Sequence, residues 1–255
     1  MSQQIFFTHV MKTGGTTLTQ ALEAAVGDGP MFPNHSPVAV VAAKSLPDYL
    51  MAETAERRAE YALISVHYPA WVTFRAVDNP VRATMLRDPV ARTISHLKQI
   101  ATSTHPAETV AEAWADDEIR RRMTDYMCQL FSDPGEPTPE AVDPNTEDPE
   151  VRRAFLRALG NGWSTAIWHP RVVDSAAAAA AIACLDRFDV VGVTDELPAF
   201  AAKLSTASGL RIQAPGHANR SLSTEQAEAW LVDEIKAATR HDQALFEHAE
   251  LLTHR

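Results

Sequence analysis

The stretch Lys12-Thr13-Gly14-Gly15-Thr16-Thr17 combines residue types that bind anions. Lysine supplies a positive charge, threonine supplies hydroxyl donors, and paired glycines permit a tight turn that presents backbone N–H groups. Residues 5–10 form an apolar run that predicts a strand, and after the stretch apolar residues recur at helical spacing (Leu18, Ala21, Leu22, Ala25 and Val26). Because a helix N-terminus favours negative charge, this strand, turn and helix predict a site for a phosphate or a sulfate. A turn whose glycines serve packing alone is the alternative.

Arg87 and Ser95 form a second candidate anion site. Arg87 follows a predicted strand at 83–86, at the sheet edge where parallel strands deliver ligand-binding residues. Ser95 lies about two turns into the next predicted helix and shares a face with Arg92 and Gln99. An arginine and a hydroxyl together can bind a terminal phosphate through charge-assisted hydrogen bonds. Alternatively, Arg87 pairs with a nearby acid and Ser95 is a surface residue.

His67 is the candidate general base. It follows a predicted strand at 61–66, so we expect it at the same sheet edge as Lys12 and Arg87. A neutral imidazole near pH 7 has the basicity needed to take a proton from a hydroxyl group. A histidine satisfied in the core or in a turn is the alternative, and His9 is a rival base.

The order of lysine and glycines separates the first stretch from a Walker A loop, in which the lysine follows the glycines. The pattern H-x-x-K-T-G-G-T-T-L at 9–18 resembles instead the 5′-phosphosulfate loop of the sulfotransferases. The resemblance is specifically to the glycan O-sulfotransferase type typified by heparan sulfate 2-O-sulfotransferase, which usually has proline at the position of Met11. L-R-D-P-x-x-R-x-x-S-x-L at 86–97 resembles the 3′-phosphate loop of the same family. Residues 188–197 are similar to its F-D-x-V-G-x-T-E stretch.

This resemblance implies the donor 3′-phosphoadenosine 5′-phosphosulfate (PAPS). Its phosphosulfate is expected over residues 12–17, and its 3′-phosphate between Arg87 and Ser95. A late loop that includes Asn219 and Arg220 corresponds to a segment that closes over the nucleotide in the family.

The resemblance also implies catalytic roles. His67 is expected to deprotonate an acceptor hydroxyl, and Lys12 to stabilise charge on the leaving oxygen. His9 is then structural or supports the site. No metal is expected, because the chain has no H-E-x-x-H motif, no clustered carboxylates and no acid suited to a Walker B role.

Strands that alternate with helices predict an α/β fold, a P-loop-like three-layer α/β/α arrangement with a mainly parallel sheet. A fourth strand is predicted at 188–193. With 255 residues and 45% hydrophobic composition, the chain can bury a substantial core and is long enough for one sizeable α/β domain or two small ones. The resemblance implies a single sulfotransferase domain over 1–255.

Helices are also predicted at 46–58, 107–115, 117–130, 151–159, 176–181, 196–208 and 224–252. Residues 132–150 contain seven acidic residues, five prolines and no lysine or arginine. Such a composition cannot pack a core, so it predicts a mobile loop.

A formal charge of −10 argues against nucleic acid as a partner, because the average field repels a polyanion. Arg120-Arg121-Arg122 is the one compact basic run. Helical surface charge is the usual explanation of such a run, and a polyanion site is the alternative. The sequence shows neither a signal peptide nor an apolar run long enough to span a membrane, so we expect a cytoplasmic protein without a transmembrane segment.

The acceptor is expected to bear a hydroxyl group and to be a small molecule, a sugar or a glycolipid. Tyr68, Trp71 and Phe74 are candidates for the floor of its pocket, with core packing as the alternative. Two other functions remain open: an ATP-dependent small-molecule kinase and a non-catalytic nucleotide-binding protein.

Overall fold

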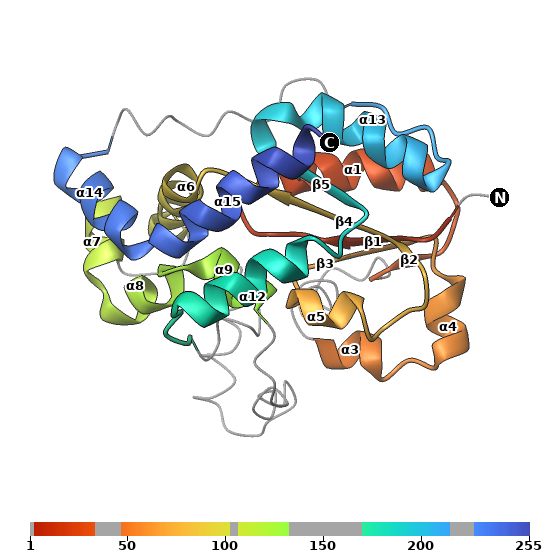
Figure 1. The fold of residues 1–255 in the computed structure, drawn as a ribbon, viewed down its shortest axis with the longest axis horizontal. Coiled ribbons are helices and arrows are strands. Elements are labelled where there is room, and N and C mark those ends of the chain that lie inside the picture. The colour runs from red at the N-terminus through yellow and green to blue at the C-terminus, as the bar shows by residue number, and fades with distance from the viewer. Residues whose placement is uncertain (1–2, 34–46, 103–106, 133–169, 215–226) are drawn as a thin grey trace.

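A computed structural model describes residues 3–33, 47–102, 107–132, 170–214 and 227–255 (Figure 1). In these ranges the chain forms a five-stranded sheet in the order β2-β3-β1-β4-β5. Every strand pairs in parallel with its neighbours. The predicted α/β class and parallel sheet are therefore confirmed.

The first strand, β1 (Ile5–Thr8), lies at the centre of the sheet. It pairs with β3 (Leu63–Val66) on one side and β4 (Val81–Leu86) on the other. Beyond these lie β2 (Met31–Phe32) and β5 (Val190–Val193). β2 was not expected, because two residues are too few to produce an alternating pattern.

Alternate residues of β1 pack against helices on opposite faces of the sheet. Ile5 and Phe7 share a buried cluster with residues of α1 (Gly15–Val26) and α13 (Leu197–Ser208). Phe6 packs instead with Val72 of α5 (Ala70–Thr73). On the same side as α5, α15 (Arg240–Thr253) covers β5. Helices on both faces are compatible with a three-layer α/β/α fold, as Figure 1 shows.

The helix α6 (Pro89–Ala101) begins as the sequence predicts. The Asp88 side chain accepts a hydrogen bond of 2.7 Å from the Ala91 N–H, and Pro89 occupies the first turn, where it loses no backbone bond. Its start directly after β4 fixes Ser95 at the same sheet edge as Arg87.

Two helices predicted as continuous are broken. The 117–130 helix is divided into α8 (Asp117–Met123) and α9 (Tyr126–Phe131), and the 224–252 helix into α14 (Ala229–Ala238) and α15. Asp125 has a left-handed φ of 44°, and its carboxylate accepts the N–H groups of His241 and Asp242. Asp242 in turn accepts the N–H groups of Met127 and Cys128. Asp125, between α8 and α9, thus caps the N-terminus of α15, and Asp242 of α15 caps the N-terminus of α9.

The remaining described elements differ in length from the predicted ones. They are α3 (Pro47–Met51), α4 (Ala55–Glu60), α7 (Val110–Ala115), α12 (Ser175–Leu185) and the 3₁₀ turn η1 (Thr194–Glu196). Of these, α12 extends beyond the predicted helix 176–181 at both ends. The predicted helix 46–58 ends early because Thr54 caps a separate helix by accepting the Arg57 N–H. The predicted helix 151–159 and, apart from Ser132, the predicted loop 132–150 lie outside the described residues. None of the helices in the described ranges combines the length and apolar character needed to cross a bilayer.

Candidate active site

The loop after β1 turns sharply into the N-terminus of α1. Lys12 has a φ of 69° and Gly14 a φ of 79°, both in the left-handed region that favours glycine. Gly14 is the N-cap of α1, and no side chain caps the helix. The first N–H groups of α1 therefore have no capping side chain, which favours an anion at this helix N-terminus.

Thr13 faces inward, unlike the rest of the loop. It is fully buried, and its hydroxyl donates a 2.9 Å hydrogen bond to the Val10 carbonyl. This hydrogen bond stabilises the turn. Thr16 and Thr17, unlike Thr13, line the cavity at the carboxyl edge of the sheet, so their hydroxyls are the candidate donors to a ligand.

Thr194 ties this loop to the end of β4. Its hydroxyl lies 3.0 Å from the Thr13 carbonyl and 3.0 Å from the Leu86 carbonyl. Arg87 adds a second tie, because its Nη1 donates to the Lys12 carbonyl at 3.2 Å. The two predicted anion sites are therefore parts of one connected structure.

A cavity of about 740 Å³ opens at the carboxyl edge of β3, β1 and β4. It gathers eight predicted site residues: Lys12, Gly14, Gly15, Thr16, Thr17, His67, Arg87 and Ser95. Asn219 and Arg220 lie outside the described residues. Parallel strands in register explain this convergence, since Thr8 lies opposite both Val66 and Thr84.

The cavity also contains residues outside the predicted donor and catalytic set. Lys98 and Thr102 join Gln99, which was expected on the Ser95 face of α6, while Met11 and the rival base His9 come from the first loop. Counting three and seven residues on from Ser95 would have found Lys98 and Thr102 as well. Arg92 was expected on that face, but it is fully buried, with its guanidinium 4.0 Å from the centre of the Tyr126 ring.

Cations gather around the loop without a carboxylate among the described lining residues. Burial lowers the pKa of the Lys12 ammonium, and the nearby charges of Arg87 and Arg92 lower it further. Burial also lowers the pKa of Arg87, against the opposing effect of Asp195 and Asp88. Like charges held this close favour an anionic ligand that offsets their repulsion.

His67 is held in a defined orientation. Its Nδ1 lies 2.7 Å from the carbonyl oxygen of His9. A carbonyl oxygen can only accept, so Nδ1 carries the proton and the neutral ring has its lone pair on Nε2. The arrangement suits a general base whose reactive nitrogen is Nε2.

No protein-family model matches the chain, and no curated protein matches it. The site is therefore interpreted from its own geometry and from the sequence motifs. Among the described residues, no group of three or more His, Cys, Asp or Glu side chains is placed to hold a metal ion.

The aromatic residues proposed for an acceptor floor do not line the described cavity. Tyr68 is buried in the cluster beneath β1 and β3, with Trp71 packed against it. Phe74 packs edge-on against Phe188 at 5.6 Å. The alternative role of these three aromatic residues, core packing, therefore accounts for their positions.

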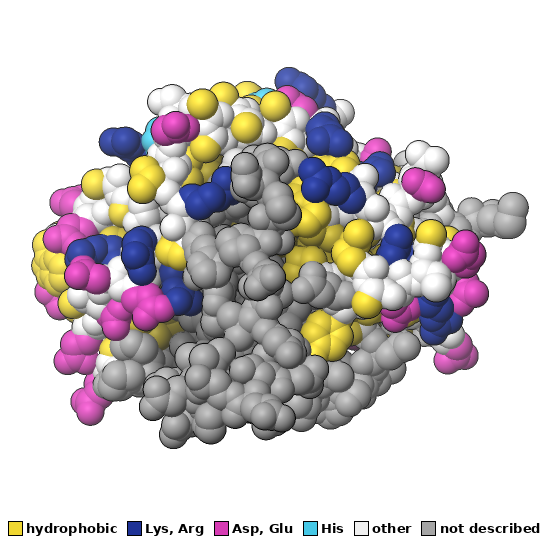
Figure 2. Space-filling view, turned by 90° about the horizontal axis from the view of Figure 1, so that it is seen from below, with side chains coloured by type: hydrophobic (Ala, Val, Ile, Leu, Met, Phe, Trp, Pro, Cys, Tyr) yellow, Lys and Arg dark blue, Asp and Glu magenta, His cyan; other side chains and the backbone are white. Residues whose placement is uncertain are grey.

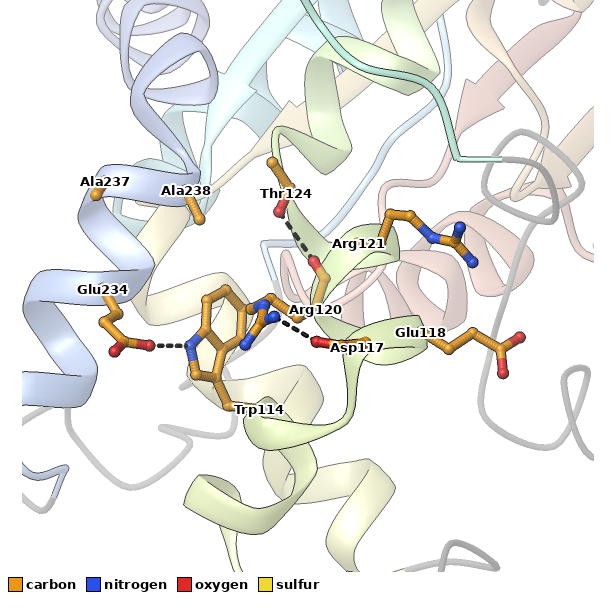
Figure 3. A pocket seen from close by; sticks show the side chains of 9 residues that line it. All are labelled: Trp114, Asp117, Glu118, Arg120, Arg121, Thr124, Glu234, Ala237 and Ala238. Carbon is orange, nitrogen blue, oxygen red and sulfur yellow. Dashed lines mark hydrogen bonds and ion pairs between the residues drawn. The ribbon is translucent and has the colours of Figure 1, made fainter.

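A second hollow of about 710 Å³ lies between α8 and α14 (Figure 3). Its polar groups largely pair with one another: the Trp114 indole N–H donates to Glu234 at 2.9 Å, and Arg120 pairs with Asp117. Figure 3 shows Arg121 and Glu118 directed away from Trp114. These pairings agree with the interpretation of Arg120-Arg121-Arg122 as charge on the surface of a helix.

Charge is unevenly spread over the surface. Figure 2 shows acidic side chains gathered mainly toward the two ends of one face, whereas several basic side chains lie nearer its middle. A net charge of −10 therefore does not preclude a locally positive binding site.

Proposed function

We propose that the protein is a PAPS-dependent O-sulfotransferase with a P-loop-like donor site. One observation carries the proposal: Lys12, Arg87 and His67 line a single cavity at the start of an uncapped helix. In the strand order β3, β1 and β4, the strands that precede His67 and Arg87 lie on opposite sides of the strand that precedes Lys12, which supports separate sites for the base and the 3′-phosphate.

In the proposed reaction, the phosphosulfate lies over the loop before α1, and Arg87 and Ser95 bind the 3′-phosphate. His67 Nε2 takes the proton from an acceptor hydroxyl as its oxygen attacks sulfur. A new O–S bond forms while the bond from sulfur to the bridging phosphate oxygen breaks. That oxygen keeps the electron pair, and Lys12 stabilises its charge. The products are a sulfate ester and adenosine 3′,5′-bisphosphate.

A kinase is the weaker alternative. Its loop would carry the lysine after the glycines, and its chemistry would require a magnesium site. A non-catalytic nucleotide-binding protein would use Lys12 and Arg87 in the same way but would not depend on His67.

Ligand preference tests the proposal. Because separate groups are proposed to bind the two ends of the donor, adenosine 3′,5′-bisphosphate should raise the melting temperature far more than ADP or AMP. Arg87→Ala should remove most of this preference, and Arg121→Ala, at an arginine outside the cavity, should not. Equal stabilisation by ADP, or a requirement for magnesium, would favour the kinase.

A further inference from the structure

The ring of His9 lies beside the ring of the proposed base, His67. The centres of the His9 and His67 rings lie 4.3 Å apart, with 45° between their planes. The other side of His9 is also occupied, because its ring stacks on Phe7 with centres 5.5 Å apart. The ring is therefore held in place between the core and His67.

Gly15 leaves the space that the His9 ring occupies. A Cβ atom added at Gly15 would lie 1.9 Å from His9 Nε2, far inside any van der Waals contact. Gly15 is the first residue of α1, so the His9 ring is adjacent both to the N-terminus of α1 and to the His67 ring. The absence of a side chain at Gly15 thus has a structural purpose beyond loop flexibility.

Two contacts of His9 act on His67 in different ways. The His9 carbonyl accepts the Nδ1 proton at 2.7 Å, which selects the tautomer with its lone pair on Nε2. The His9 ring restricts rotation of the His67 ring by contact. Neither contact requires His9 to exchange a proton with a substrate.

We infer that His9 is a positioning residue that holds His67 in the tautomer and orientation required of the base, an inference that rests on the proposed function. His9 acts through His67 alone. Its removal therefore lowers turnover only when His67 is present, and it leaves the affinity for the donor product nearly unchanged.

Nitrogen NMR of protein with ¹⁵N-labelled histidine tests the tautomer without any need for activity. In the wild type, His67 should show the proton on Nδ1 and an unprotonated Nε2. His9→Ala keeps the backbone carbonyl but removes the ring that holds His67 against it, so the His67 ring should turn partly away from the carbonyl and both tautomers should be populated. His9→Phe, which keeps a flat ring against His67, should restore a single tautomer. A proton found on Nε2 in the wild type, or a tautomer unchanged in His9→Ala, would overturn the inference.

A double-mutant cycle tests the functional part, with slow hydrolysis of the donor as the assay and water as nucleophile. His9→Ala should lower turnover by up to about 100-fold, the loss that a displaced catalytic group typically causes. In the His67→Ala background it should cause no further loss, because the two residues act as a unit. Equal losses in both backgrounds would show a purely structural role and would contradict the inference. Thermal shifts with adenosine 3′,5′-bisphosphate separate the two proposals: no binding by the wild type would count against the proposed function, while the NMR result still decides the role of His9.

Discussion

At the scale of single residues, a backbone carbonyl decides the chemistry of His67. Nδ1 is committed to the His9 carbonyl, so only Nε2 can accept a proton from a substrate. The ring itself needs no carboxylate partner for this, because the carbonyl performs the orienting role that an acid performs in many hydrolases.

His67→Ala should therefore affect chemistry and leave donor binding intact. We expect turnover to fall by about two to four orders of magnitude, the usual contribution of a positioned base. Affinity for adenosine 3′,5′-bisphosphate, measured by calorimetry, should stay within a few fold. His254→Ala, at a largely exposed histidine, is the control. Turnover that survives in His67→Ala would show that the base lies elsewhere.

Lys12 predicts a pH dependence of donor binding. Burial and two neighbouring cations lower the pKa of its ammonium, so the free protein loses this charge below the usual pH of about 10.5. A bound anion raises the pKa again, and binding therefore takes up a proton on the alkaline side. Affinity for the bisphosphate should fall as pH rises through the lowered pKa.

Lys12→Arg provides the comparison, because a guanidinium keeps its charge at that pH. The affinity of Lys12→Arg for the bisphosphate should stay constant to a higher pH than that of the wild type, whatever its value at neutral pH. Lys236→Arg on the exposed face of α14 should behave like the wild type. If the alkaline decline is the same in Lys12→Arg, another group causes it.

At the scale of elements, two aspartates join four helices. Asp125 caps α15 with hydrogen bonds of 2.9 and 3.2 Å, and Asp242 caps α9 with bonds of 3.0 and 2.7 Å. Asp242 is fully buried, and burial raises its pKa to about 6 despite the two N–H groups that it accepts. Asp125 nearby raises the pKa further, and Arg92 acts against it.

This carboxyl group should make stability decrease as pH rises from about 4 to about 6. In that window the unfolded chain has lost the Asp242 proton while the native state keeps it, so the native state binds more protons. The free energy of unfolding should fall across the window by an amount on the order of 3 kcal/mol relative to Asp242→Asn, which cannot ionise.

Urea unfolding of both proteins from pH 4 to pH 7 measures this difference. Leu204→Ala, which removes buried apolar contacts and no titratable group, should lower stability to a similar extent at every pH. Parallel curves for wild type and Asp242→Asn would show that Asp242 ionises alike in both states.

At the scale of the whole molecule, one arginine holds together the two ends of a long undescribed segment. The Arg171 N–H donates to Gln129 Oε1 at 3.1 Å, and its Nη2 donates to the carbonyl and hydroxyl oxygens of Ser132, each at 3.1 Å. Since Ser132 and Arg171 flank residues 133–169, the chain leaves and returns at nearly the same place.

Replacement of residues 133–169 by a short glycine–serine linker should therefore leave a folded protein that still binds adenosine 3′,5′-bisphosphate. The bisphosphate-induced shift of the melting temperature measures this, and adding Arg171→Ala to the shortened protein should lower its melting temperature. If the shortened protein folds but no longer binds the bisphosphate, residues of the segment belong to the donor site.

The sequence by itself determined the sheet edge at which the candidate site lies. Apolar runs that end at Lys12, His67 and Arg87 specify strands, and parallel pairing brings their carboxyl ends together. The start of α6 at Asp88 and Pro89 was also predictable, because a cap depends on residues that are neighbours in sequence.

Only the tertiary structure decided the rest, because the deciding contacts join residues far apart in the chain. The helix break near Asp125 depends on Asp242, more than a hundred residues later, and helical periodicity contains no sign of it. Arg92 looks like a surface cation in the sequence, yet it is buried against Tyr126. The tautomer of His67 depends on a carbonyl in another strand's loop, which no local pattern can specify.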